Sequence, residues 1–172
     1  MGRSENTDTL DGSLSSEDEG HLIDELRGLK GQRSPRQARV ARAAQMLEQT
    51  RSPRVRNAAA SALADLRAGG ATDALINLLT RPDTAGSRGT LLYALELLGA
   101  DVPLPDLAEI IAEGSYEARE EALGLIDRDR IECSLEDLAL ARATLEAAPV
   151  SADGERARAI RRGLEYLRTK HY

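Results

Sequence analysis

Very few side chains in this sequence stand at the spacings that acid–base, nucleophilic or metal chemistry requires. The two histidines, His21 and His171, lie far apart, and neither has a cysteine or a second histidine at a spacing typical of metal ligands. Cys133 is the single cysteine, and its apolar neighbours Ile131 and Leu135 predict a small buried hydrophobic residue rather than a reactive thiol. The sequence has no motif for a nucleophilic serine, a phosphate-binding glycine loop or a zinc site. We therefore expect no metal, no cofactor and no catalysis.

The charged residues that could recognise a partner are arginines. Residues 26–56 carry nine bases and one acid, whereas residues 1–25 carry eight acids and one base. Four arginines of this basic zone could share a surface: Arg36, Arg39, Arg42 and Arg54. Two interpretations stay open. In the first, the upstream acids fold back and shield the arginines. In the second, the arginines bind an acidic patch of a partner protein and steer its approach.

The composition predicts an all-helical protein of one domain. The chain has 172 residues, enough for one ordinary core, and contains 27 Ala and 26 Leu but no Phe and no Trp. Ala and Leu favour helices, and the residues that favour strands are scarce, so an all-β fold is excluded. Aromatic residues make up 2% of the chain and the net charge is −6. A site that stacks bases or binds nucleic acid is therefore not expected.

The two ends of the sequence differ from its middle. Residues 1–15 are acidic, rich in Ser, Thr, Gly and Asp, and contain only two leucines, so we expect a disordered tail. Ser16 and Glu19 form the pattern of a capping box, which predicts that the first helix starts there and runs to Gly31. Residues 169–172 are expected to form a short C-terminal tail. The chain has no apolar segment long enough to span a membrane, and its single cysteine favours a reducing cytoplasm.

The tetrapeptide Arg-Ser-Pro-Arg occurs twice, each time just before a helical pattern. A Ser-Pro pair could be a phosphorylation site. An N-cap at Ser34 and another at Ser52, each with proline at the first helical position, explain both copies without a regulator. We therefore expect one helix that ends near Gln49 and a second that ends near Arg67.

Short helices and turns alternate through the rest of the chain. Apolar residues recur at helical spacing between breaks at Gly, Pro or Ser, which predicts nine short helices in all. Their connections are short, which favours antiparallel neighbours. The sequence thus divides into an N-terminal capping helix and about four helix pairs, over residues 16–30, 35–67, 71–98, 105–127 and 134–168.

An internal repeat runs through the middle of the chain. The helical pattern around Arg56 recurs 32 residues later around Arg88 and a further 31 residues later around Arg119. Residues 52–66, with their Val-Arg, Ala-Ala and Ala-Leu pairs, resemble the second helix of a HEAT repeat, and residues 70–79 resemble the first helix of the next.

The resemblance to HEAT repeats implies a short right-handed α-solenoid over residues 16–168, in which each helix pair packs mainly on its neighbours. In that family the repeated arginine commonly pairs with an acid in the turn between paired helices. The resemblance therefore implies two structural ion pairs, Arg88 with Asp83 and Arg119 with Glu113.

The same resemblance implies that the second helix of each pair lines a concave face. The repeat alignment places four candidate contact residues on that face: Asn57, Ser61, Tyr93 and Glu120. Tyr93 is the one large side chain among them, and an interior position beside Leu92 stays open for it. We expect a non-catalytic, monomeric scaffold or adaptor that binds a partner protein on this face and on the basic zone. A narrower version is an inhibitor of the immunity-protein type. The alternative is a HEAT-like lyase or DNA glycosylase acting on a bound chromophore or base.

Overall fold

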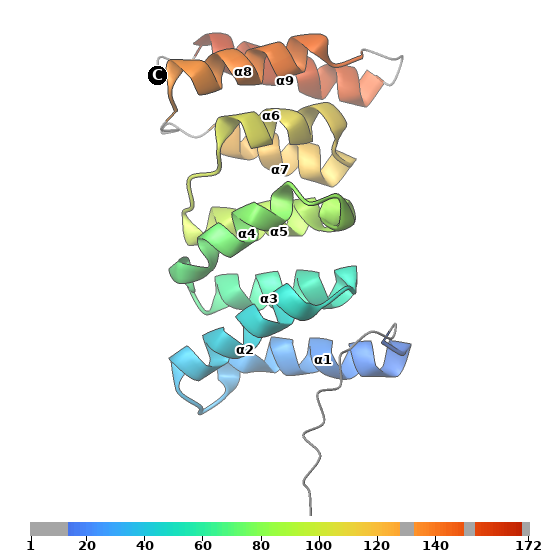
Figure 1. Cartoon of the computed structure of the whole chain (residues 1–172), viewed down its shortest axis with the longest axis vertical. Coiled ribbons are helices and arrows are strands. Elements are labelled where there is room, and N and C mark those ends of the chain that lie inside the picture. Colours follow the sequence, from blue (N-terminus) through green and yellow to red (C-terminus); the bar gives the residue numbers. More distant parts are fainter. Residues whose placement is uncertain (1–13, 128–132, 150–153, 170–172) are drawn as a thin grey trace, which may run out of the picture.

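The computed structural model describes residues 14–127, 133–149 and 154–169. Within these ranges it contains nine α-helices and no strand, which confirms the predicted all-α class (Figure 1). The α-helices are α1 Ser16–Gly28, α2 Arg36–Gln49, α3 Pro53–Asp65, α4 Thr72–Leu79, α5 Arg88–Leu98, α6 Leu104–Glu113, α7 Tyr116–Ile126, α8 Leu135–Ala147 and α9 Gly154–Thr169. Three 3₁₀ turns, η1 Leu29–Gly31, η2 Gly69–Ala71 and η3 Pro82–Ser87, connect some of them.

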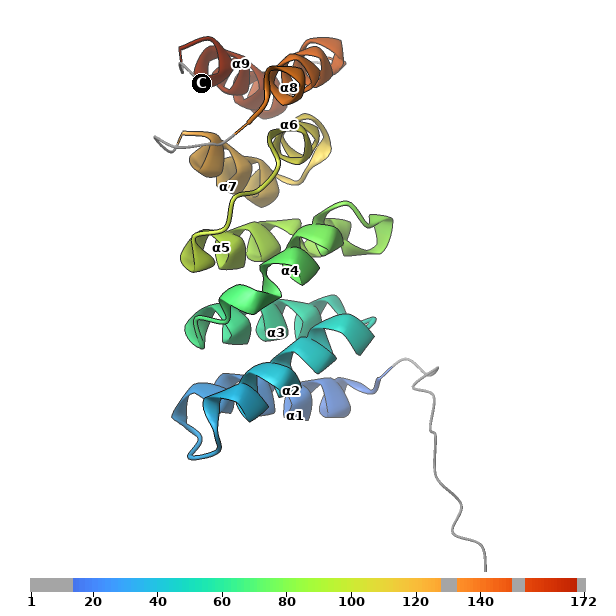
Figure 2. The same cartoon turned by 60° about the vertical axis from the view of Figure 1, so that its left-hand side comes forward.

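The helices form two rows along the long axis of the molecule (Figures 1 and 2). In the first row, α1, α3, α5, α7 and α9 each pack on the next member. The other four helices, α2, α4, α6 and α8, lie alongside this row, and each packs against the helix that follows it in the chain. One end of the stack therefore consists of α1 and α2, and the opposite end consists of α8 and α9 (Figure 1).

The expected tails fall mostly outside the part of the chain that the structure describes. Of the N-terminal tail, only Leu14 and Ser15 are described, and they lead directly into α1. At the other end, Thr169 is the last residue of α9 rather than part of a tail, and residues 170–172 lie outside the described ranges. No helix in these ranges combines the length and the apolar character needed to cross a membrane.

Serine side chains cap three of the helices, Ser52 among them as predicted, because each hydroxyl accepts a hydrogen bond from a first-turn N–H group that has no intrahelical partner. Ser52 caps α3 through the N–H of Val55, and Ser115 caps α7. Ser134 caps α8 and forms a full capping box with Asp137.

Two predicted N-caps were wrong. The N-cap of α1 is Ser15, which accepts from the N–H of Asp18, so the cap lies one residue before the expected Ser16, which is the first residue of the helix. The N-cap of α2 is Pro35, and Ser34 instead donates to the side chain of Gln32. The first turn of α2 consequently has no side-chain cap.

The C-terminal end of α3 also differs by two residues from the predicted end. The α-helix stops at Asp65, and Arg67 adopts a positive φ of 52°. The N–H groups of Arg67 and Ala68 then bond back to carbonyls of the last helical turn, as in a Schellman ending. A non-glycine residue in this left-handed region carries strain, which the two hydrogen bonds offset.

Small side chains and leucines build one core between the rows. Val55, Ala59 and Leu63 of α3 are fully buried, and burying one leucine side chain contributes roughly 1.5–3 kcal/mol. Small residues let helices approach closely where they cross. A Cβ atom placed on Gly163 of α9 would lie 2.9 Å from Cδ1 of Leu145 in α8. The Ala- and Leu-rich composition follows from this packing.

The first predicted ion pair, Arg88 with Asp83, is absent. Arg88 instead donates from Nε to the carbonyl of Leu79, at the end of α4, over 2.8 Å. The carboxylate of Asp83 accepts from Arg81 over 3.0 and 2.8 Å and from the buried Arg56 over 3.4 Å. Arg56 therefore connects α3 to η3. The acid that the resemblance assigned to Arg88 pairs instead with Arg56, the equivalent arginine of the preceding repeat.

The second predicted ion pair, Arg119 with Glu113, is also absent. Nη1 of Arg119 donates to the carbonyl of Gly114, just past the end of α6, over 3.0 Å. Arg88 and Arg119 thus play the same role, because each satisfies a carbonyl that helix geometry leaves without a partner. The repeat alignment predicted that the two arginines are structural, but the predicted acceptors, the carboxylates of Asp83 and Glu113, were wrong.

Candidate functional site

Two of the four arginines expected to bind a partner donate hydrogen bonds to carbonyls at the ends of helices. Arg36 donates to the carbonyls of Leu66 and Arg67, at the end of α3, over 3.0 and 2.6 Å. Arg39 donates to two carbonyls at the end of α1 and in η1, over 2.9 and 3.0 Å. A ligand that drew these side chains away would leave carbonyl groups of two helix ends without their partners.

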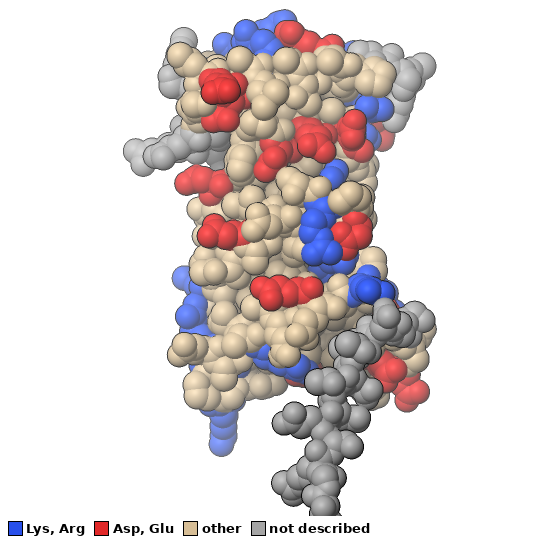
Figure 3. Space-filling view, in the orientation of Figure 1, with Lys and Arg blue, Asp and Glu red and all other residues tan. Residues whose placement is uncertain are grey.

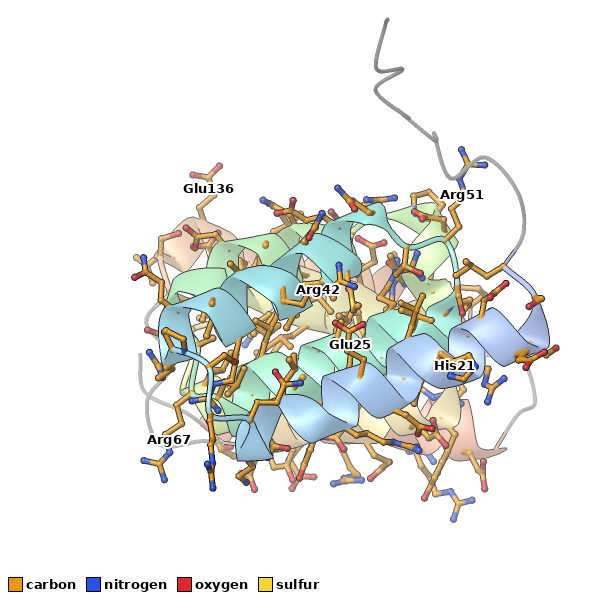
Figure 4. The ribbon with its side chains drawn as sticks, turned by 90° about the horizontal axis from the view of Figure 1, so that it is seen from below. His21, Glu25, Arg42, Arg51, Arg67 and Glu136 are labelled. Atoms are coloured by element: carbon orange, nitrogen blue, oxygen red, sulfur yellow. The ribbon has the colours of Figure 1, made fainter. Side chains whose placement is uncertain are left out.

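The other two arginines pair with acids of α1. Arg42 makes two hydrogen bonds with the carboxylate of Glu25, over 2.7 and 3.1 Å (Figure 4). This hydrogen bonding lowers the pKa of Glu25 and raises the pKa of Arg42. Arg54 reaches Glu19 over 3.3 Å. The interpretation in which upstream acids shield the basic zone therefore holds for Glu19 and Glu25, while residues 1–13 lie outside the described residues.

The expected contact residues of α3 line a groove on the outer side of the first row. This groove has a volume of about 370 Å³ and lies between α1, α3 and α5. It brings together three predicted residues, Arg54, Asn57 and Ser61, beside Thr90 of α5. The side-chain oxygen of Asn57 is buried and accepts no hydrogen bond within the chain. A hydrogen-bond donor from a ligand could therefore be accommodated there.

Tyr93 lies on the surface, which removes the interior alternative. Its side chain is 47% exposed, and Leu97, one helical turn further along α5, is 54% exposed. Residues four positions apart share a helix face, so these two side chains form one apolar patch with a polar hydroxyl. Sequence reasoning missed Leu97 because α5 contains five leucines. The available signal was that Leu97 falls off the buried stripe that Leu91 and Leu95 mark.

Glu120 of α7 is partly exposed and already has a partner. Its carboxylate accepts from Nη1 of Arg162, in α9, over 2.9 and 3.2 Å. The neighbouring Glu121 has a raised pKa, because of burial and then because of the charge of Glu96 on α5. The helix α7, which packs on α5, thus carries one acid paired with Arg162, Glu120, and one acid close to Glu96, Glu121.

Acidic groups also gather on the side of the molecule that α2, α4, α6 and α8 form. Figure 3 shows Asp and Glu side chains over α6 and α8, with Lys and Arg side chains at the top and along one edge of the stack as well as lower down. Burial and the nearby charge of Glu109 raise the pKa of Asp106 in α6.

A second and larger groove, which sequence reasoning missed, opens at the end of the stack between α1 and α2. Its volume is about 790 Å³, and its apolar lining consists of Leu14, Leu22, Met46, Pro53 and Val55. Polar and charged side chains, among them Asp18, His21, Arg42 and Arg51, form the rest of the lining (Figure 4). No local sequence pattern predicts this groove, because it forms where α1 and α2 both pack on α3 without packing tightly on each other.

The remaining candidates for chemistry are dispersed. Within the described ranges, no three His, Cys, Asp or Glu side chains come together as metal ligands would. Cys133 is only partly buried rather than buried as expected, and it packs at the edge of the core. Burial and the charge of Asp137 raise its pKa, so the neutral thiol is favoured over the nucleophilic thiolate.

Comparison of the chain with models of protein families, with curated proteins and with solved structures finds no match.

Proposed function

We propose that the chain is a non-catalytic protein-binding module, a short right-handed HEAT-like α-solenoid of four helix pairs with α1 as its N-terminal cap. Support for the architecture comes from the two rows of helices, in which each member contacts only near neighbours. Support for binding comes from the outer surface of the row α1, α3, α5, α7 and α9. No observation within the described residues favours the lyase or glycosylase alternative, so we do not propose it.

The observation that carries this proposal is the exposed pair Tyr93 and Leu97 at the middle of the row. Burying these two side chains would remove on the order of 200 Å² from water, about 5 kcal/mol before the costs of association. Tyrosines at the centre of an interface are frequent hot spots, and polar groups around them exclude water. Here α5 packs between α3, which carries Asn57 and Ser61, and α7, which carries Glu120.

The charges around this patch define the partner. The four candidate arginines of the basic zone, Arg36, Arg39, Arg42 and Arg54, are bonded within the chain, so an acidic partner would have to displace internal contacts there. The helix that packs on α5 next in the row, α7, carries the acids Glu117, Glu120 and Glu121, of which Glu120 is paired with Arg162. The partner surface that fits is an apolar side chain with basic residues around it, and charge complementarity would speed its approach.

The test is affinity capture with the full-length chain as bait, in the lysate of its source organism. We expect one protein to be captured by the wild type and lost with Tyr93→Ala or Leu97→Glu. The matched control is Leu140→Glu, since Leu140 on α8 has the same 54% exposure but lies far from the patch. Once the captured protein is purified, Tyr93→Ala should weaken its binding by roughly 30-fold, the factor for a 2 kcal/mol hot spot. Equal capture by Leu97→Glu and the wild type would refute the site.

A further inference from the structure

The repeated tetrapeptide Arg-Ser-Pro-Arg has a capping role at only one of its two positions. In the second copy, Ser52 is 9% exposed, and its hydroxyl caps α3. In the first copy, Pro35 holds the N-cap position of α2, and this cap makes no side-chain hydrogen bond. Helix capping therefore explains the second Ser-Pro pair and does not explain the first, Ser34 with Pro35.

Ser34 is open to solvent within a long exposed segment. It lies in the connection between η1 and α2, and every residue from 30 to 38 is exposed. Its hydroxyl donates to the side-chain oxygen of Gln32 over 3.4 Å, which is long for a hydroxyl donor. An enzyme that modifies a hydroxyl must reach it together with the residues on both sides. Ser34 offers that access, whereas the hydroxyl of Ser52 must first leave the cap of α3.

The corner of the molecule that holds this connection is rich in cations. Arg33 and Arg36 flank the Ser-Pro pair, and both are exposed. Arg36 donates to the main-chain carbonyl of Arg67 over 2.6 Å, which places the exposed Arg67 at the same corner (Figure 4). A fourth exposed cation, Lys30, pairs with Asp65 over 3.2 Å. Guanidinium groups bind phosphate oxygens through paired hydrogen bonds, so this corner has the chemistry to hold a phosphate.

We propose that Ser34 is the phosphorylation site of a proline-directed protein kinase, and that Arg33, Arg36 and Arg67 bind the phosphate. In the transfer, the hydroxyl oxygen of Ser34 forms a bond to the γ-phosphorus of ATP. The bond from that phosphorus to the bridging oxygen breaks, ADP leaves, and the hydroxyl proton passes to a base of the kinase. The phosphate adds a charge of about −1.5 to −2 near pH 7 and three acceptor oxygens.

The phosphate connects the start of α2 to the end of α3 through Arg36. This arginine already donates to the carbonyls of Leu66 and Arg67, and a guanidinium carries more N–H groups than these two bonds use. Phosphorylation therefore adds contacts without removing those that end α3. The site lies at the α1/α2 end of the stack, whereas Tyr93 lies on α5, so this proposal does not depend on the proposed partner.

Incubation of the purified full-length chain with a proline-directed kinase, Mg²⁺ and ATP tests the site, with a peptide substrate of that kinase in the same tube. We expect mass spectrometry to find one phosphate, on Ser34. Ser34 should be modified roughly tenfold faster than Ser52 or more, because the Ser52 hydroxyl is held in a cap. Ser34→Ala should lose the phosphate, and Ser52 serves as the matched control because the same tetrapeptide surrounds it. Equal modification of the two serines would overturn the proposal. An unmodified Ser34 after full conversion of the peptide substrate would overturn it as well.

Thermal unfolding of the phosphorylated and unphosphorylated chains tests the role of the arginines. We expect phosphorylation to raise the Tm by about 2–4 °C at low salt, and high salt should reduce the gain because it screens exposed charges. Arg33→Ala and Arg67→Ala should each reduce the gain. Arg168→Ala is the matched control, since it removes an exposed arginine of α9 at the opposite end, and it should keep the full gain. A Tm that phosphorylation leaves unchanged or lowers would refute the binding of the phosphate, and so would a full gain in both Arg33→Ala and Arg67→Ala.

Discussion

Arg56 is fully buried, with 1% of its surface exposed, and its replacement tests how a charge is tolerated inside the stack. The guanidinium donates to the carbonyls of Asp83 and Thr50 over 3.3 Å each and approaches the Asp83 carboxylate at 3.4 Å. These bonds are long, and Nε has no partner. Burial lowers the pKa of Arg56, which reflects the cost of removing this cation from water. We therefore expect the charge itself to contribute little net stability.

The expected magnitudes follow from volume and solvation. Arg56→Met keeps a long apolar side chain in place and should change the free energy of unfolding by less than about 1 kcal/mol, because the desolvation cost of the cation disappears together with its weak bonds. The two carbonyls that lose a donor belong to Thr50, which is partly exposed, and to Asp83, which is exposed. Arg56→Ala also empties the space and should cost about 3 kcal/mol, as comparable large-to-small changes in cores do.

Urea and thermal unfolding followed by circular dichroism measure both changes. The loss of about 3 kcal/mol in Arg56→Ala corresponds to a fall in Tm of roughly 6–12 °C for a chain of this size. The wild type and Arg56→Met should unfold within a few degrees of each other. The reasoning fails if Arg56→Met is as unstable as Arg56→Ala, because the bonds and the charge would then matter more than the volume.

Two paired substitutions test local features of the helices by the same unfolding measurements. Ser52→Ala should lower the free energy of unfolding by about 1 kcal/mol, because it removes the cap of α3. Ser34→Ala should change it by no more than about 0.5 kcal/mol, because Pro35 holds the N-cap position of α2. Equal losses in the two variants would contradict the assigned caps. Gly124→Ala should stabilise α7 by about 0.5–1 kcal/mol, since a Cβ there meets nothing within 4 Å. Gly114→Ala should destabilise by at least about 1 kcal/mol, since its Cβ would lie 2.5 Å from the carbonyl oxygen of Ile110; a neutral result would mean that the end of α6 can move.

The positions of the helices could be predicted from the sequence because capping and apolar periodicity are local. The one-residue error at α1 has a local cause as well, since Ser15 with Asp18 and Ser16 with Glu19 fit the same capping pattern. The error at Ser34 has a different cause. The same tetrapeptide surrounds Ser52, so no local rule separates the two copies, and the difference must come from residues distant in sequence.

The roles of the arginines show where sequence reasoning stops. Arg36 and Arg39 have the spacing of an exposed basic surface, yet their hydrogen-bond acceptors are carbonyls that only the folded chain brings within reach. Tyr93 could be placed by repeat alignment, but its exposure depends on how α5 is rotated against its neighbours. The α1/α2 groove depends on the separation of two helices, which no residue pattern encodes.

The arginine contacts to helix-end carbonyls have a consequence for how such a chain can evolve. Arg36, Arg39, Arg88 and Arg119 all donate to the main chain, which offers the same acceptor whatever side chain a position carries. The stack can therefore be conserved without specific side chains at the residues whose carbonyls accept these hydrogen bonds. The outer positions of the row can accumulate substitutions while the helices keep their places, so descendants of one ancestral chain could share this architecture and select different ligands.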